Sequence, residues 1–242
     1  MQLNNKIVIT GGSGKFGLIL QKKYKSNKLF YPNKKKLNIL SLKSIESYLK
    51  KIKPKFLIHL AGLSRPMKIH DKNIYKSIDL NIIGTANIVK VCSRLKIKII
   101  YFSTNYVYEG TKGNYKEHQP LLPINNYAWS KLGGEASVQM YKNSLILRIC
   151  MTEKPFIHKK AFYNVKTNFI FQEKIAEILF KLLNYKGIIN VGGDIQTIYN
   201  FAKKFNNNIG KIHLKKKNKY NFPLNPSMDI KKLKKILNNN FS

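Results

Sequence analysis

A tyrosine and a lysine four residues apart, Tyr127 and Lys131, could together carry out acid–base chemistry. On a helix, residues at this spacing share one face, with Cβ atoms about 5–6 Å apart. A free phenol has a pKa of about 10, and a neighbouring ammonium lowers it by favouring the phenolate. Tyr127 is therefore a candidate general acid or base. An isolated pair of this kind is also common on the surface of an amphipathic helix.

A second element supports the catalytic interpretation. Ser103 and Thr104 follow the apolar run Ile97–Phe102, which is typical of a buried strand. Open α/β sheets place their ligands at the carboxyl ends of such strands. Thr104 could donate a hydrogen bond to a substrate carbonyl, and Tyr127 could help to polarise the same oxygen while a hydride arrives. The alternative is that the two hydroxyls merely cap the loop.

Three glycines at a spacing of three, Gly11, Gly14 and Gly17, follow the apolar run Ile7–Thr10. Gly11 can take the tight turn off a strand, Gly14 lets the backbone approach a pyrophosphate, and Gly17 lets the next helix pack against the sheet. The helix N-terminus would direct free N–H groups at the phosphates. We therefore predict a dinucleotide site, the alternative being an ordinary strand-to-helix turn.

Apolar runs that suit buried parallel strands alternate with segments of helical period. The expected strands are Ile7–Thr10, Lys28–Tyr31, Phe56–Leu60, Ile97–Phe102, Ser144–Ile149 and Ile188–Val191. One expected helix begins at Phe16. The others span Leu42–Ile52, Ile74–Leu95, Tyr127–Tyr141, Glu173–Leu183, Thr197–Phe205 and Met228–Leu237. This alternation predicts an α/β fold with a Rossmann-like, doubly wound parallel sheet.

We expect residues 1–150 to form the nucleotide-binding domain and residues 151–242 a reduced C-terminal substrate-binding region. About twenty residues after Ile149 lack regularity and resemble a loop-rich insertion, whereas residues 171–192 are expected to return to the core. The basic segment Asn206–Lys219 is expected to be a solvated loop or edge.

Composition excludes several classes of protein. The net charge of +34 invites a nucleic-acid interpretation, but the basic residues are scattered and include only three arginines, so we expect no nucleic-acid partner. The positive field would still attract an anionic ligand. Two cysteines and dispersed histidines predict neither a disulfide framework nor a metal site. No run is long enough to span a membrane, so we expect a soluble, cytoplasmic protein.

The motifs together resemble those of the extended short-chain dehydrogenases/reductases, and most closely the dTDP-4-dehydrorhamnose reductase-like branch of sugar-nucleotide enzymes. They are Thr10–Gly17, Leu37–Ile39, His59–Gly62, Asn81–Thr85, Ser103–Tyr108 and Tyr127–Glu135. The resemblance implies that Thr104, Tyr127 and Lys131 are the catalytic residues and that Lys131 also holds the nicotinamide ribose.

The resemblance also implies a cofactor site that runs along several loops. With the glycine turn and the turn after the second expected strand, it comprises Gly11, Ser13, Gly14, Lys15, Phe16, Gly17, Asn33, Lys34, Asn38, Ile39, Ala61, Gly62, Tyr127 and Lys131. Lysines 34–36 stand where an acidic residue would accept a ribose hydroxyl in NAD-binding proteins. They would suit a 2′-phosphate, so NADP(H) is favoured and NAD(H) remains an alternative.

Some positions depart from the branch or carry weaker assignments. Asn105 replaces the usual aspartate after Thr104, and no Asp-Glu pair is present there, so a dehydratase is disfavoured. We expect Asn105 to contact the substrate and Arg65 to meet an anionic ligand group. His59 is expected to be structural or to form a wall of the cofactor site.

The leading expectation is an NADP(H)-preferring reductase of a nucleotide-linked 4-keto-6-deoxy sugar, in which Tyr127 gives the proton. Such an enzyme would supply polysaccharide biosynthesis. The alternatives are an epimerase that retains NAD and a non-catalytic, cofactor-binding regulatory subunit. The resemblance further implies a possible homodimer.

Overall fold

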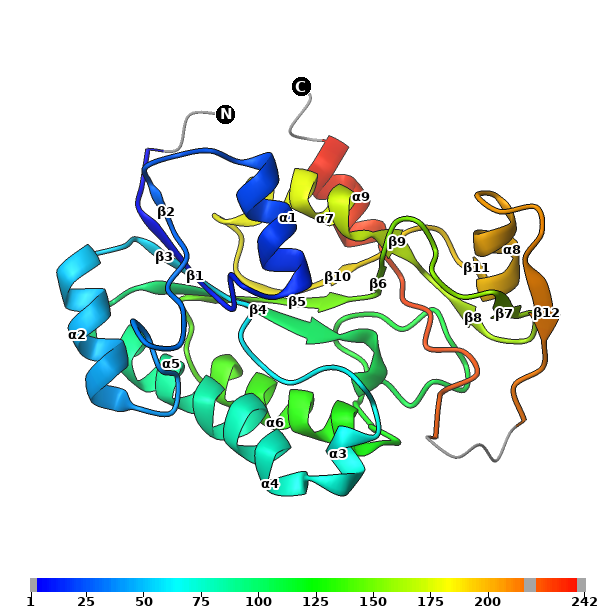
Figure 1. Ribbon diagram of the computed structural model, residues 1–242, viewed down its shortest axis with the longest axis horizontal. Helices are drawn as coiled ribbons and strands as arrows, with labels where there is room; N and C mark the ends of the chain where they lie inside the picture. Colours follow the sequence, from blue (N-terminus) through cyan, green and yellow to red (C-terminus); the bar gives the residue numbers. More distant parts are fainter. Residues whose placement is uncertain (1–3, 216–220, 239–242) are drawn as a thin grey trace.

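A six-stranded parallel sheet forms the centre of the protein (Figure 1). The structure, a computed structural model, describes residues 4–215 and 221–238. The strands are, in spatial order, β10 (Gly187–Val191), β5 (Ser144–Ile149), β4 (Lys98–Thr104), β3 (Phe56–His59), β1 (Ile7–Thr10) and β2 (Leu29–Phe30). The order reverses between β1 and β3, so the sheet is doubly wound and the predicted fold class is confirmed.

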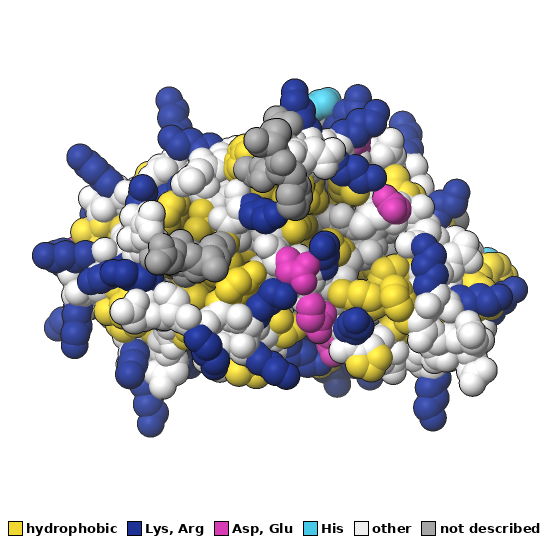
Figure 2. Space-filling view, turned by 90° about the horizontal axis from the view of Figure 1, so that it is seen from above, with side chains coloured by type: hydrophobic (Ala, Val, Ile, Leu, Met, Phe, Trp, Pro, Cys, Tyr) yellow, Lys and Arg dark blue, Asp and Glu magenta, His cyan; other side chains and the backbone are white. Residues whose placement is uncertain are grey.

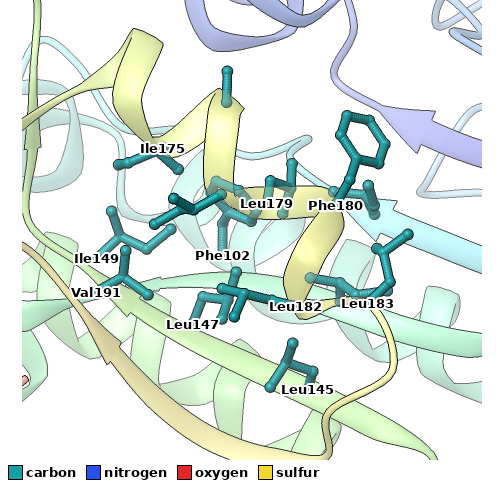
Figure 3. Close-up of a cluster of buried hydrophobic side chains, with 14 of the residues drawn as sticks. Phe102, Leu145, Leu147, Ile149, Ile175, Leu179, Phe180, Leu182, Leu183 and Val191 are labelled. Atoms are coloured by element: carbon teal, nitrogen blue, oxygen red, sulfur yellow. The ribbon is translucent and has the colours of Figure 1, made fainter. Parts of the chain in front are cut away.

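Helices cover both faces of this sheet (Figure 1). One face carries α1 (Lys15–Lys23), α7 (Gln172–Leu179) with the 3₁₀ turn η3 (Phe180–Leu182), and α9 (Lys231–Asn238). The other carries α2 (Leu42–Ile52), α5 (Gly84–Arg94) and α6 (Asn126–Gln139). Successive strand residues point to opposite faces, which is why Leu145 and Leu147 pack toward α7 (Figure 3) while Ile146 packs toward α5 and α6. Both faces of β5 therefore pack against apolar side chains.

Local signals set both ends of α2. The Ser41 side chain accepts a hydrogen bond from the backbone N–H of Ser44, as an N-cap residue should. At the other end of α2, Lys53 adopts a left-handed conformation just before Pro54. The predicted boundaries of α2 are confirmed.

The predicted long helix at Ile74–Leu95 is only partly correct. The segment consists of α4 (Ile74–Ser77), the π-helical η1 (Ile78–Ile83) and α5. Within η1, the Asn81 amide donates to the Leu63 carbonyl at 2.9 Å and to the Ser130 hydroxyl at 2.8 Å. The π-helical turn has i→i+5 hydrogen bonds and is wider than an α-helical turn. It contains Asn81, which connects the loop after β3 to α6.

The region after Ile149 contains more regular structure than expected. Its short strands pair as β6 (Met151–Thr152) with β9 (Ile170–Phe171), β7 (Lys160–Phe162) with β12 (Gly210–Ile212), and β8 (Lys166–Thr167) with β11 (Gln196–Thr197). The helix of this region is α8 (Ile198–Lys203). Earlier in the chain, α3 (Ile69–Lys72) follows β3, and the 3₁₀ turn η2 (Asn105–Val107) follows β4. β12 is an edge strand in the segment expected to be a loop or edge, of which residues 216–219 lie outside the described residues.

The final helix begins three residues later than predicted. Met228 is fully buried and forms an isolated β-bridge with Tyr115 instead of entering a helix.

Over the face that carries α1, α7 and α9, many basic side chains surround a few acidic ones (Figure 2). Among the described residues, no helix is long and apolar enough to cross a membrane.

Candidate active site

The glycine turn after β1 has the geometry of a phosphate cradle. Gly11 has a φ of +72°, and a Cβ on it would lie 2.6 Å from the backbone nitrogen of Ala61. A Cβ on Gly17 would lie 2.7 Å from the carbonyl oxygen of Gly11. Within the described part of the chain, no side chain caps α1 at Gly14. Its first N–H groups can therefore bind an anion, and these residues fit the pyrophosphate of a dinucleotide.

The other predicted cofactor residues near this turn differ in exposure. Ser13 and Lys15 are exposed beside the turn. Phe16 is buried, and its ring lies 5.3 Å from that of Phe102. The Phe16 side chain therefore belongs to the core, and only its backbone lies at the turn.

The predicted adenine end follows β2. Asn33 and Lys34 are exposed, and the Asn33 side chain accepts a hydrogen bond from the Lys36 backbone N–H at 3.1 Å. Asn38 is half-buried, whereas Ile39 is buried and packs close to Gly84. The Lys34 ammonium is thus free to move toward a ligand phosphate.

Thr104 and Tyr127 come together at the carboxyl edge of the sheet. Thr104 ends β4, and Tyr127 lies in the first turn of α6, where the Asn125 side chain accepts a hydrogen bond from the Ala128 N–H. The Thr104 hydroxyl lies close enough to Tyr127 to lower the pKa of its phenol. The Tyr127 ring lies 5.1 Å from that of His70. The two hydroxyls predicted to share a carbonyl oxygen are therefore adjacent.

The electrostatics of Tyr127 correct one expectation. Burial raises the pKa of Tyr127, and the nearby Thr104 hydroxyl and the charge of Arg65 oppose that shift only in part. The predicted net lowering of this pKa is therefore wrong for the protein chain by itself, and the influence of Lys131 on it stays a prediction. The physical reason is that desolvation of the phenolate outweighs the nearby charges.

Lys131 is also strongly desolvated. Its Nζ atom lies 4.2 Å from the centre of the Tyr101 ring, and burial lowers the pKa of Lys131 to about 7, with Glu135 opposing the shift. The lysine therefore holds its positive charge weakly near neutral pH. His59 lies nearby between Thr10 (2.8 Å) and Thr85 (3.1 Å), and burial with the Lys131 charge lowers its pKa to about 3. His59 is therefore neutral, and its role as a structural residue or as a wall of the cofactor site stays a prediction.

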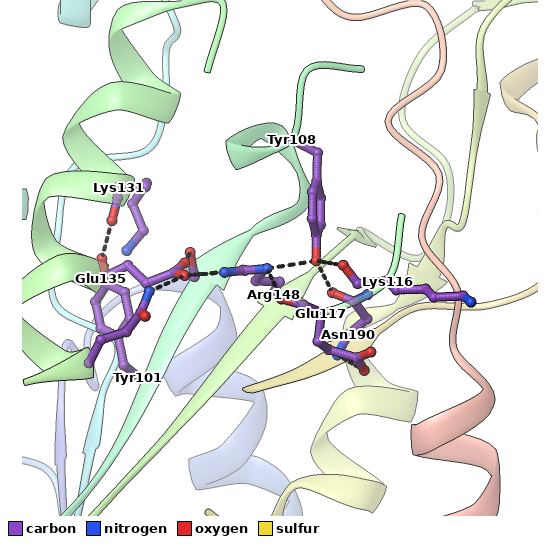
Figure 4. A network of polar contacts seen from close by, with 10 residues as sticks. Tyr101, Tyr108, Lys116, Glu117, Lys131, Glu135, Arg148 and Asn190 are labelled. Atoms are coloured by element: carbon purple, nitrogen blue, oxygen red, sulfur yellow. Dashed lines mark hydrogen bonds and ion pairs between the residues drawn. The ribbon is translucent and has the colours of Figure 1, made fainter. Parts of the chain in front are cut away.

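A buried ion pair anchors the helix that carries this site (Figure 4). Glu135 lies one turn after Lys131 on α6, and its Oε1 accepts hydrogen bonds from Arg148 Nη2 at 2.7 Å and Nε at 3.1 Å. Ser103 donates to the other carboxylate oxygen. Arg148 also donates to the Tyr108 hydroxyl at 2.7 Å. These contacts join α6, β4 and β5 through Glu135, Ser103 and Arg148. Ser103 directly precedes Thr104 in the chain, and Glu135 lies one turn after Lys131.

The two predicted substrate residues have different settings. Asn105 is buried, and its amide nitrogen donates to the Pro226 carbonyl at 3.1 Å, which fastens the C-terminal segment to the site. Its role toward a substrate stays a prediction. Arg65 is exposed at the site edge and lies 3.5 Å from Glu153.

Sequence reasoning missed Glu135, His70 and Glu153 as neighbours of the site. Glu135 continues the four-residue step from Tyr127 through Lys131, so this spacing could have identified it. His70 and Glu153 reach the site through loops, and no sequence pattern indicates either residue.

Comparisons with known proteins identify the family. Residues 5–161 match the family described as the RmlD substrate binding domain. The chain belongs to this family. The resemblance inferred from the motifs is therefore confirmed.

Two sequence relatives have different names. Methionine adenosyltransferase 2 subunit beta of Xenopus laevis is 29% identical over 156 residues, which are 60% of this chain and 46% of that protein. The spore coat polysaccharide biosynthesis protein SpsK of Bacillus subtilis is 29% identical over 148 residues, which are 59% of this chain and 52% of that protein. The match thus spans about half the length of these curated relatives.

Solved structures share the fold over almost the whole chain. The dTDP-4-dehydrorhamnose reductase of Bacillus anthracis, in complex with NADP, has a TM-score of 0.85 at 20% identity and covers 98% of this chain and 93% of its own. WbmG of Bordetella bronchiseptica, in complex with NAD, has a TM-score of 0.75 at 16% identity, covering 96% and 87%. At these identities the similarity concerns the fold.

Proposed function

We propose that this protein is a nicotinamide-dependent reductase that acts on a nucleotide-linked 4-keto-6-deoxy sugar, with NADP(H) as the favoured cofactor. The observation that carries the proposal is the adjacency of the Thr104 and Tyr127 side chains at the sheet edge. The glycine turn of Gly11, Gly14 and Gly17 lies at the same edge and fits a dinucleotide pyrophosphate. The structural similarity to proteins named dTDP-4-dehydrorhamnose reductase supports the substrate class.

In this proposal Thr104, Tyr127 and Lys131 each have a separate role in the reduction. When bound, the nicotinamide supplies the hydride. Thr104 donates a hydrogen bond that orients the substrate carbonyl, and Tyr127 donates the proton to its oxygen. Because burial raises the pKa of Tyr127, the phenol stays protonated before the reaction and is ready to act as an acid. Lys131 would hold the ribose from the inner side of α6.

The second candidate is a cofactor-binding subunit without catalytic turnover. It is favoured by the sequence relatives whose name describes a subunit of methionine adenosyltransferase. A protein of that kind would bind NADPH through the same glycine turn but would leave a keto sugar unchanged.

A turnover assay distinguishes the two. The wild type is mixed with NADPH or NADH and with dTDP-4-dehydrorhamnose or a related nucleotide 4-keto sugar, and oxidation of the cofactor is followed by absorbance. The Tyr127→Phe variant is the matched control, because it removes only the hydroxyl and should lower turnover by about 10²–10⁴-fold with little loss of NADPH binding. Tight NADPH binding with no oxidation by the wild type would favour the subunit.

A further inference from the structure

Three charged side chains from separate segments meet beside the glycine turn. Lys15 is the first residue of α1, Arg65 lies in the loop after β3, and Glu153 directly follows β6. The Lys15 ammonium donates to both carboxylate oxygens of Glu153, at 2.9 and 3.0 Å. Arg65 Nη1 lies 3.5 Å from one of them. One carboxylate therefore engages two cations.

The exposure of the three groups identifies Glu153 as the inner member. Its side chain is 20% exposed, against 69% for Lys15 and 60% for Arg65. Acidic residues are scarce in this chain, with 11 against 45 basic ones. This scarce negative charge pairs with the side chain of Lys15, the first residue of α1, and the N-terminus of a helix favours anions. The pyrophosphate of a dinucleotide would bind at the same helix end.

We infer that Glu153 is a resident anion of the dinucleotide site, which holds Lys15 and Arg65 until the phosphates of the ligand take its place. This inference rests on the proposed function and adds a determinant of cofactor affinity to it. Lys15 and Arg65 become partners of the phosphates once they leave Glu153. Binding must break their contacts with the carboxylate and work against its negative charge, so Glu153 lowers cofactor affinity and speeds release.

The opposite role would be a strap, in which the contact between Lys15 and Glu153 closes over a bound cofactor. The two roles predict effects of opposite sign. Removing a competing anion strengthens binding, whereas removing a strap weakens it.

The test uses the full chain with Glu153→Gln, which removes the charge and keeps the shape. Glu177→Gln is the matched control: Glu177 also pairs with a lysine of α1, Lys23 at 3.1 Å, but at the far end of that helix. Both variants change the net charge equally. Glu153→Asp keeps the carboxylate and should behave like the wild type.

The dissociation constant for NADPH is measured by fluorescence at several salt concentrations. We expect Glu153→Gln to bind NADPH about three- to tenfold more tightly than Glu177→Gln at low salt, as one unit charge a few ångströms from a phosphate would require. Its affinity should fall more steeply with added salt, because two freed cations now face the phosphates. Inorganic pyrophosphate should compete with NADPH more strongly in this variant.

Equal or weaker NADPH binding by Glu153→Gln than by Glu177→Gln would overturn the inference while leaving the proposed function intact. Failure of the wild type and of every variant to bind NADPH or NADH would overturn both.

Discussion

The sharpest stability prediction concerns the buried ion pair between Glu135 and Arg148. Their side chains are 0% and 2% exposed. Glu135 accepts hydrogen bonds from Arg148, from Ser103 and from Gln139. Replacing Glu135 by Gln preserves the volume but leaves the Arg148 guanidinium buried without a counter-charge.

Removing one partner of such a pair costs about 3–5 kcal/mol of unfolding free energy, since the remaining charge has lost its partner but not its desolvation penalty. For a chain of this size that loss lowers the melting temperature by about 6–20 °C. Glu177→Gln removes an exposed carboxylate and should cost less than about 0.5 kcal/mol. Urea unfolding followed by circular dichroism measures both variants.

The double variant Glu135→Gln/Arg148→Met tests the reason for the loss. Because it has no unpaired buried charge, it should recover at least about 1 kcal/mol relative to Glu135→Gln alone. If Glu135→Gln unfolds like Glu177→Gln, or if the double variant loses the sum of both single losses, the electrostatic account of this pair is refuted.

Two further predictions concern cofactor binding. Because burial lowers the pKa of Lys131 to about 7, the wild type should lose NADPH affinity as pH rises through that value, whereas Lys131→Met should bind weakly with a flatter pH profile. In the unfolded chain Lys131 keeps its usual pKa of 10.5, so between pH 7 and 10.5 the unfolded state binds one more proton than the folded state. The unfolding free energy of the wild type, measured in urea, should therefore rise with pH over this range relative to that of Lys131→Met. Lys34→Glu should raise the Kd for NADPH about tenfold and leave that for NADH nearly unchanged, because only the 2′-phosphate faces this charge; equal losses for both cofactors in a fluorescence titration would contradict the predicted preference.

Local patterns predicted most of the sheet and its helices. The strand Ile7–Thr10 and the helix Leu42–Ile52 were predicted with the boundaries that the structure has. Both depend on signals within a few residues, namely an apolar run before glycines and a serine cap with a proline stop. The π-helical turn at Asn81 could not be predicted this way, because the Asn81 amide binds Leu63 and Ser130, which are distant in the sequence.

The same limit applies to the candidate site. The spacing of Tyr127, Lys131 and Glu135 places all three on one face of α6, as helical geometry requires. Spacing does not say how deeply that face is buried. Depth decides the sign of the result here, because desolvation lowers the pKa of Lys131 and raises that of Tyr127.

The charges near Tyr127 therefore come from loops more than from its own helix. Arg65 lowers the pKa of Tyr127 and is held at the site edge by Glu153. A ligand phosphate that displaces Glu153 would replace one carboxylate by another anion, so the Arg65 side chain would remain neutralised but would follow the ligand. If Arg65 moves with the ligand away from Tyr127, the pKa of the phenol rises and Tyr127 becomes a weaker acid. If Arg65 moves with the ligand toward Tyr127, that pKa falls and Tyr127 becomes a stronger acid. The pH profile of turnover in Arg65→Lys and Arg65→Met, compared with that of the wild type, reports which movement occurs.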